Sequence, residues 1–318
     1  MTRTILIRVA SLIPLVILAS FVTFWLLQLT ETDPAVVRLG DDATEEAYEL
    51  YREEIGVNDP FLVQYGSWLA NAATGDLGES WHGPDQVSEL ISERLSVTIS
   101  LALGGLFVAV AIGMVAGVAA GVRAGRPADA MITAAASSGQ ALPNFWVGIL
   151  LVAFVAIPYD VFPATLYTGP TESVWNWLLS ITLPSIALGT SAAAAIARQT
   201  RAAFVRVLHE PYIRTALAVG LPRRSILYRT ALRNACIPVV TSAATLFGTL
   251  LGGAIVVEAV FAYPGLGNLV LVGIQNGDLP IVLGFVFVAA VAVALVQLVL
   301  DITYTIIDPR TRVSLSDG

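Results

Sequence analysis

Six long apolar stretches restrict what this chain can fold into. Each is close to, or longer than, the roughly 20 apolar residues that a helix needs to cross the hydrocarbon core of a bilayer. Inside that core every backbone amide must find its partner within the chain, which favours helices. The predicted spans are approximately residues 5–29, 97–122, 131–157, 178–197, 235–261 and 281–306. We therefore predict an all-α polytopic membrane protein with six transmembrane helices.

The composition agrees with a lipid environment. Only 13% of the residues are charged, whereas a soluble domain carries about a quarter. The first stretch is too long for a signal-peptide core and lacks a small-residue cleavage site, so we expect it to remain as an anchor. The sequence thus predicts a multi-pass protein of the cell membrane.

The arginines set the predicted orientation, because basic residues concentrate on the cytoplasmic side of a membrane. The six-span arrangement places 14 of the 17 arginines on one side, and both termini are therefore expected in the cytoplasm. We divide the chain into a first transmembrane helix (1–29), an extracytoplasmic loop (30–94) and a five-helix core (95–318). The core contains a cytoplasmic loop at 198–234.

The extracytoplasmic loop is strongly acidic, with 15 carboxylates against three arginines and a net charge of −12. Two amphipathic helices are expected in it, one starting near Asp42 and ending at Gly56, the other opening at Asp59-Pro60. Three interpretations of the charge stay open. It is a solvated surface, a docking patch for a partner, or part of a salt-adapted surface.

Several kinds of chemistry are excluded by missing residues. A phosphate-binding P-loop needs a lysine, and this chain has none, so ATP would have to bind another polypeptide. Cys236 is the one cysteine, which rules out an internal disulfide. His82 and His209 fall on opposite predicted sides and are expected to be solvated or capping. No catalytic constellation or metal site is evident, so we predict that the chain is not an enzyme and binds no cofactor or metal.

A few residues within the spans stand out. Gly113, Gly117 and Gly121 share one helical face, where small residues let two helices approach closely. Glu258 and Asp301 lie near the ends of the fifth and sixth spans, and structural pairing or capping is favoured over contact with a substrate. Secondary transporters typically place acids or broken helices at the midplane, and neither is clear in the sequence.

Residues 214–234 contain five arginines and no acid. Pro211 and Pro222 suit first turns of helices, and Gly220 suits a helix end with positive φ, so we expect a helix, a break and a second helix over residues 223–236. Contact of the arginines with anionic lipid headgroups explains the charge but not the break. A DNA-reading helix pair is unexpected in a loop held at both ends by membrane spans. Docking of a cytoplasmic subunit accounts for both features.

The segment "YIRTALAVGLPRRSILYRTALRNACIP" resembles the cytoplasmic coupling loop of ABC-importer permeases that serve dipeptides, oligopeptides and nickel. The fragments "GDLGESW", "LPNFWVG", "FAYPGLGNLV" and "DITYTIIDPR" resemble the same family in the same order. The resemblance implies a type I importer fold and a permease subunit that forms half of a translocation pathway. Peptides or related small solutes are the implied substrates, with nickel or sugars also open.

The family pattern is transferred residue by residue. Arg214 stands in the place of its glutamate, Thr215 and Ala216 are its small pair, Gly220 is its glycine, and Leu232 begins its leucine-proline pair, here followed by arginine. The predicted ATPase-coupling residues are Tyr212, Arg214, Thr215, Ala216, Gly220, Leu221, Arg223, Arg224, Leu232 and Asn234.

The resemblance also implies partners. These are a second related permease, identical or different, two cytoplasmic ATPase subunits that bind the ATP, and an extracytoplasmic solute-binding protein, with no nucleic acid. Gln140, Asn144 and Trp146 are candidates for the lining of the pathway. The alternative function is a secondary transporter driven by an ion gradient.

Overall fold

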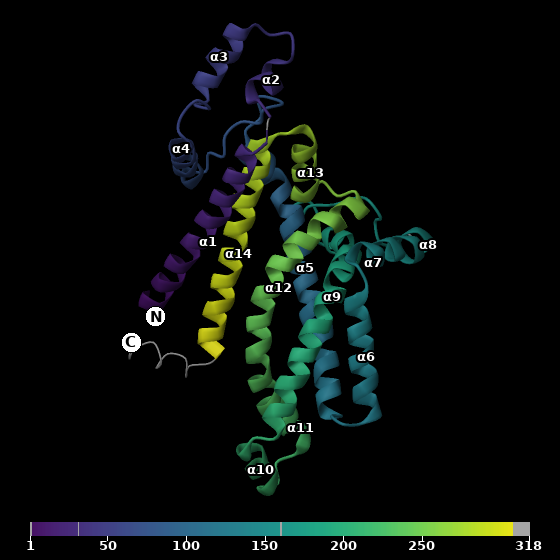
Figure 1. Ribbon diagram of the computed structural model, residues 1–318. Helices are drawn as coiled ribbons and strands as arrows, with labels where there is room; N and C mark the ends of the chain where they lie inside the picture. The colour runs from purple at the N-terminus through teal and green to yellow at the C-terminus, as the bar shows by residue number, and fades with distance from the viewer. Residues whose placement is uncertain (1, 31, 160, 308–318) are drawn as a thin grey trace. The chain divides into compact units, whose positions relative to one another are not determined.

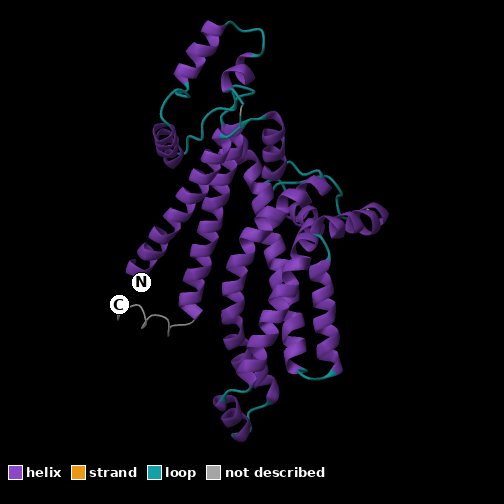
Figure 2. Ribbon diagram, viewed as in Figure 1, coloured by secondary structure: helices purple, strands orange, loops and turns teal. Residues whose placement is uncertain are grey.

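The structure is a computed structural model that describes residues 2–30, 32–159 and 161–307. Helices joined by loops make up this part of the chain, which holds no strand, and its one isolated bridge joins Glu79 to Gln86 (Figure 2). The chain divides into two compact units. One is built mainly from Val97–Tyr263, and the other from Leu6–Ser96 and Pro264–Ala294.

The larger unit consists mostly of long helices (Figure 1). Its elements include α5 (Val87–Val122, from Val97 on), α6 (Pro127–Ala141), α7 (Asn144–Leu151), the π-helix η1 (Val152–Ala156), α8 (Ile157–Tyr159), α9 (Val174–Leu208), α10 (Pro211–Ala218), α11 (Arg223–Ser225), the π-helix η2 (Ile226–Ala231) and α12 (Leu232–Phe261). The predicted second, fourth and fifth spans are therefore confirmed as helices α5, α9 and α12.

The three glycines that share a face of α5 lie directly against α9. A Cβ atom added to Gly113 would come within 2.6 Å of the Cβ of Ile196, and one added to Gly117 within 2.5 Å of the Cβ of Thr200. One on Gly121 would lie 3.1 Å from a side-chain atom of α9. The predicted close approach is confirmed, and we call this contact the glycine seam.

The third predicted span is not a straight helix. Leu142 leaves helical geometry with ψ 125°, and Pro143 follows it. The ring of a proline disfavours the helical conformation of the residue before it, and this accounts for the break. α6 and the segment Asn144–Tyr159 meet at an angle of 95°. The expectation of one continuous span over 131–157 was therefore wrong, and the broken helix that the sequence analysis did not find is present.

The number of spans remains a prediction. Among the described residues, four helices are long and apolar enough to cross a membrane, or five if the bent pair forms one span. The first predicted span corresponds to α1 (Thr2–Gln28), in which Ile13–Gln28 is a shorter apolar helix. Arg310 and Arg312, used for the orientation, lie outside the described residues, as does the side chain of Asp301.

Two deeply buried polar side chains, Glu258 and Tyr263, form hydrogen bonds inside the larger unit. Glu258 is fully buried, and the hydroxyl of Thr98 donates to its Oε1 at 2.5 Å. Tyr263 is almost as deeply buried and donates its phenolic hydrogen to the backbone carbonyl of Ser180 at 2.8 Å. A buried polar group is costly unless bonded, so these contacts hold α5, α9 and the end of α12 together. Structural pairing of Glu258 is confirmed.

The second unit combines parts of three long helices with several short helices. It contains most of α1, α2 (Pro34–Leu39), α3 (Glu45–Glu54), α4 (Phe61–Thr74), the start of α5, α13 (Leu266–Asn276) and the first part of α14 (Leu279–Ile307). Both helices expected in the acidic loop are present. The first starts slightly later than expected, because the hydroxyl of Thr44, rather than Asp42, caps it. α14 confirms the helix predicted for the sixth span.

Arg52 of α3 joins the two short helices α2 and α3. Its guanidinium donates to Asp33 at 2.5 Å and to Glu49 at 2.7 Å. Asp33 also caps α2 by accepting from the amide of Ala35 at 2.9 Å. The hydrogen bond from Arg52 holds the pKa of the Asp33 carboxyl below its ordinary value. A cap and an ion pair thus share one carboxylate in the acidic loop.

We expect Gly117→Ala to destabilise the larger unit. The new methyl group would meet the backbone oxygen of Ala197 at 2.6 Å, and overpacking of this kind costs about 1–3 kcal/mol. Thermal unfolding of the purified protein in detergent should show a lower midpoint. Gly252→Ala is the matched control, because no atom lies within 4 Å of its added methyl group. Equal midpoints for the two variants would contradict the tight seam.

The joint between α2 and α3 should weaken in acid. Folding lowers the pKa of the Asp33 carboxyl below its ordinary value of 3.8. The ion pair with Arg52 therefore contributes fully to the stability of the folded state above pH 3.8, and this contribution is lost as the pH falls through the lowered pKa. The protection factors of residues 34–54, which correct for the intrinsic pH dependence of amide exchange, should therefore be lower at pH 3 than at pH 7. Arg52→Gln should show low protection factors at both pH values, and wild-type protection factors that do not change with acid would contradict the assignment.

Candidate functional site

The loop predicted to be cytoplasmic begins where α9 ends, at Leu208 rather than at residue 198 as predicted. After Leu208 only His209 and Glu210 precede α10, whose first residue is Pro211. The missing amide of a proline costs nothing at that position, so the sequence favours a new helix there. In Figure 1, α10 and α11 lie beyond the ends of α9 and α12. The expected helix, break and helix are confirmed.

The break depends on Gly220, which has φ 82°. Its amide donates to the carbonyl of Leu217 at 3.0 Å, and the amide of Leu221 donates to that of Ala216 at 3.1 Å. This pairing satisfies carbonyls at the end of α10 and requires a left-handed residue, which glycine adopts without steric cost. Pro222 directly precedes α11 rather than opening it.

The second helix of the loop differs from the prediction. It does not end near residue 236 but passes from α11 through the π-helix η2 into α12. The cytoplasmic segment and the fifth span are therefore one helical rod with a wider turn at Ile226–Ala231. π-turns are rare and occur frequently at functional sites. The sequence carries no recognisable signal for it.

An apolar cluster fixes the base of the loop. Ala203 and Phe204 of α9 pack with Ala231 and Ala235 on the returning rod, and all four are buried. Ile213 of α10 and Ile226 of η2 are also buried, each with 2% of its surface exposed. A groove of about 450 Å³ lies beside this cluster, lined by Met114, Val115, Val118, Ala119, Val122, Arg123, Leu227, Tyr228 and Leu232. The loop is thus attached to the rod and to α9 by buried apolar contacts.

The solvent-exposed face of the loop carries both apolar and basic side chains. Val219 has 77% of its surface exposed and Leu217 53%. No acidic side chain occurs between Pro211 and Asn234. We define the coupling surface by its exposed residues Tyr212, Arg214, Leu217, Val219, Leu221, Arg223, Arg224 and Tyr228. Exposed apolar side chains gathered in this way are typical of surfaces that contact another protein or a membrane.

The predicted coupling residues lie mostly on this exposed side. All are exposed except Ala216 and Leu232, which are half-buried. The structure also brings two of them together, since Asn234 donates to the hydroxyl of Tyr212 at 3.4 Å. The sequence analysis missed the exposed Leu217, Val219 and Tyr228, because the family pattern singles out other positions.

A second group missed by the sequence analysis joins α9 to α6. Arg201 donates through Nε and Nη2 to the two oxygens of Asp129, both at 2.6 Å. The amide of Gly125 adds a third bond to this carboxylate at 3.0 Å. The Asp129 side chain is only 7% exposed. Two parallel bonds from one guanidinium make a strong and directional contact.

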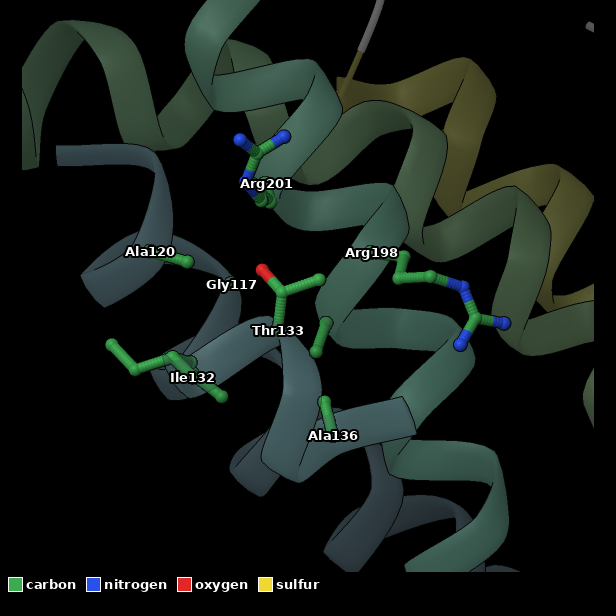
Figure 3. Close-up of a pocket in the computed structure, with 9 residues that line it drawn as sticks. Gly117, Ala120, Ile132, Thr133, Ala136, Arg198 and Arg201 are labelled. Atoms are coloured by element: carbon green, nitrogen blue, oxygen red, sulfur yellow. The ribbon is translucent and has the colours of Figure 1, made fainter. Parts of the chain in front are cut away.

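Small residues pack closely beside this ion pair. Figure 3 shows Gly117 and Ala120 of α5, Ile132, Thr133 and Ala136 of α6, and Arg198 and Arg201 of α9. The space that they enclose holds about 10 Å³, which is room for one water at most. The arrangement therefore serves packing and not the binding of a solute. Arg198 points away from Thr133 (Figure 3) and is exposed.

The three candidate pathway residues flank the bend between α6 and α7. Gln140 lies near the end of α6, and Asn144 and Trp146 lie in the first turn of α7. Gln140 and Trp146 are exposed, whereas Asn144 accepts a hydrogen bond from Ser191 of α9 at 2.9 Å. The three residues thus lie on the two sides of the bend, and Asn144 is held by α9.

Comparison with known proteins gives matches along almost the whole chain. A family described as binding-protein-dependent transport system inner membrane component matches residues 109–313, and its N-terminal counterpart matches residues 1–102. A peptide transport system permease protein of Brucella abortus (strain 2308) is 39% identical over 98% of this chain and 99% of its own. The glutathione transport system permease protein GsiC of Escherichia coli (strain K12) is 36% identical over 96% of this chain and 97% of its own.

Proposed function

Since the chain belongs to the family of binding-protein-dependent transport system inner membrane components, we propose that it forms half of the pathway of a peptide importer. The chain is a permease subunit of an ATP-driven importer in the cell membrane. The observation that carries the finer proposal is the coupling surface, because its exposed apolar and basic side chains offer a site for a separate ATPase.

The proposed assembly has several members. A second permease completes the pathway, two ATPase subunits bind the coupling surfaces, and an extracytoplasmic protein delivers the solute. Binding of ATP brings the ATPases together and moves α10 with them. The movement shifts the permease between inward- and outward-facing states, so the ATPases act as a ligand that favours one state over the other.

Peptides are the proposed substrates. The relatives named above carry peptide and glutathione in their names, and they match this chain over nearly its full length. Gln140, Asn144 and Trp146 supply amide and indole groups beside the bend between α6 and α7. Such groups suit the backbone of a short peptide, which offers both hydrogen-bond donors and acceptors.

A secondary transporter driven by an ion gradient is not favoured. The broken helix is a feature that such proteins share. The two buried acids described in the larger unit, however, are engaged in structural contacts, Glu258 with Thr98 and Asp129 with Arg201. The family of the chain is also one of transport systems that depend on a binding protein.

The coupling surface should capture the ATPase. We expect Leu217→Asp to reduce copurification of the ATPase subunit by at least about tenfold, which corresponds to about 1.4 kcal/mol of binding free energy. The side chain is 53% exposed, so the chain itself should still insert and fold. Leu62→Asp, at an exposed leucine of α4, is the control and should leave copurification unchanged. Equal capture by both variants would remove the proposed role of this surface.

Uptake into vesicles tests the whole function. The complete complex should accumulate radiolabelled glutathione or trialanine with ATP on the ATPase side, and ionophores should not prevent it. Gly220→Pro should abolish this uptake without preventing insertion, because proline excludes φ 82° and removes the bond to Leu217.

Gly220→Ala should have a smaller effect, since no atom lies within 4 Å of the added methyl group and the left-handed backbone costs about 1–2 kcal/mol. Accumulation of either probe by this chain alone, driven by a proton or sodium gradient, would refute the proposed function.

A further inference from the structure

Displacement of α10 is passed directly to α9, while α11 is continuous with η2 and α12. Only two residues separate α9 from α10, and Phe204 near the end of α9 is fully buried in the cluster at the base of the loop. Along its length α9 packs against α5 through the glycine seam, in which Gly117 lies against Thr200. Backbones in such close contact move together because neither can bend without a clash.

Two polar contacts attach α9 to the broken helix pair. Arg201 holds Asp129 in the first turn of α6, and Ser191 donates to Asn144 in the first turn of α7 at 2.9 Å. Ten residues of α9 separate the two contacts, which is about 15 Å along a helix. One contact lies on each side of the bend, so together they fix the position of both halves relative to α9.

We propose that the Arg201–Asp129 pair is a positioning contact that transmits the movement of the coupling surface through α9 to α6 and α7. The inference rests on the proposed function and identifies the residues that connect the ATPase to the pathway. Through this pair, displacement of α9 moves the bend and the side chains of Asn144 and Trp146 beside it. The pair itself touches no solute.

The geometry of the pair suits this task better than an apolar contact would. Apolar side chains in lipid slide past one another at little cost, since the surroundings are equally apolar. A guanidinium with two bonds to one carboxylate resists both translation and rotation. The amide of Gly125 adds the turn between α5 and α6 to the same carboxylate, at 3.0 Å.

The experiment follows the movement of α7 directly and needs no substrate. Phe145→Cys places a reporter thiol on α7, where the native side chain is 44% exposed, in a Cys236→Ser background that removes the one native thiol. The complete complex in lipid nanodiscs is labelled with a maleimide, with and without a non-hydrolysable ATP analogue. With the ion pair intact, we expect the analogue to change the labelling rate by at least about threefold, as a shift between two populated states requires.

Asp129→Asn should reduce this dependence on the nucleotide, because the Ser191–Asn144 bond would then hold the bend to α9 without its counterpart on α6, while the assembled complex keeps its ATPase activity. Arg201→Gln is the milder second variant, because the arginine side chain is already 35% exposed, and it should act in the same way. Arg198→Gln is the matched control on the same helix and should leave the dependence intact. A merely structural pair would lower the amount of assembled complex but would not separate ATP hydrolysis from the movement of α7.

The outcomes distinguish this inference from the proposed function. An assembled complex that hydrolyses ATP, yet shows no nucleotide dependence with the pair intact, would overturn the inference alone. Undiminished dependence in both Asp129→Asn and Arg201→Gln would also overturn it. A wild-type chain that captures no ATPase would instead refute the proposed function.

Discussion

The close contact between α5 and α9 is the constraint on which the rest of the larger unit depends. Lipid offers no apolar driving force between helices, so their association relies on close packing and on polar bonds. The glycine seam supplies the packing, and Thr98 with Glu258 adds a buried bond between α5 and α12. Packed in this way, α9 is a stiff helix that runs from the bend between α6 and α7 to the loop that contains α10.

Much of this arrangement could be predicted from the sequence, because it follows from local rules. The length and apolar character of four stretches predicted α5, α9, α12 and α14. The preference of glycine for positive φ predicted the break at Gly220. The spacing of the three glycines predicted a close contact between two helices, but it did not predict that the partner is α9. For the cytoplasmic loop, family resemblance identified the segment, and the structure then showed which of its side chains are exposed.

The features that sequence reasoning missed depend in part on tertiary contacts. Asp129 and Arg201 are 72 residues apart, and nothing local marks them as partners. The long apolar run over 131–157 favoured a continuous span, and the effect of Pro143 on Leu142 was not used, so the 95° bend was missed. Leu217, Val219 and Tyr228 of the coupling surface were missed because the family pattern singles out other positions, and their exposure is shown only by the structure.

The π-turn η2 affects how α11 and α12 are rotated relative to each other about their common axis. A helical turn of this kind accommodates an additional residue, and each residue of an α-helix corresponds to about 100° of rotation. Phe247 and Leu250, both buried in the larger unit, therefore keep their angular position because the wide turn at Ile226–Ala231 absorbs that residue. Loss of a single residue there would close the wide turn to an ordinary α-turn and leave the downstream core side chains facing inward, whereas the same deletion farther along α12 would rotate the rest of the helix by about 100°.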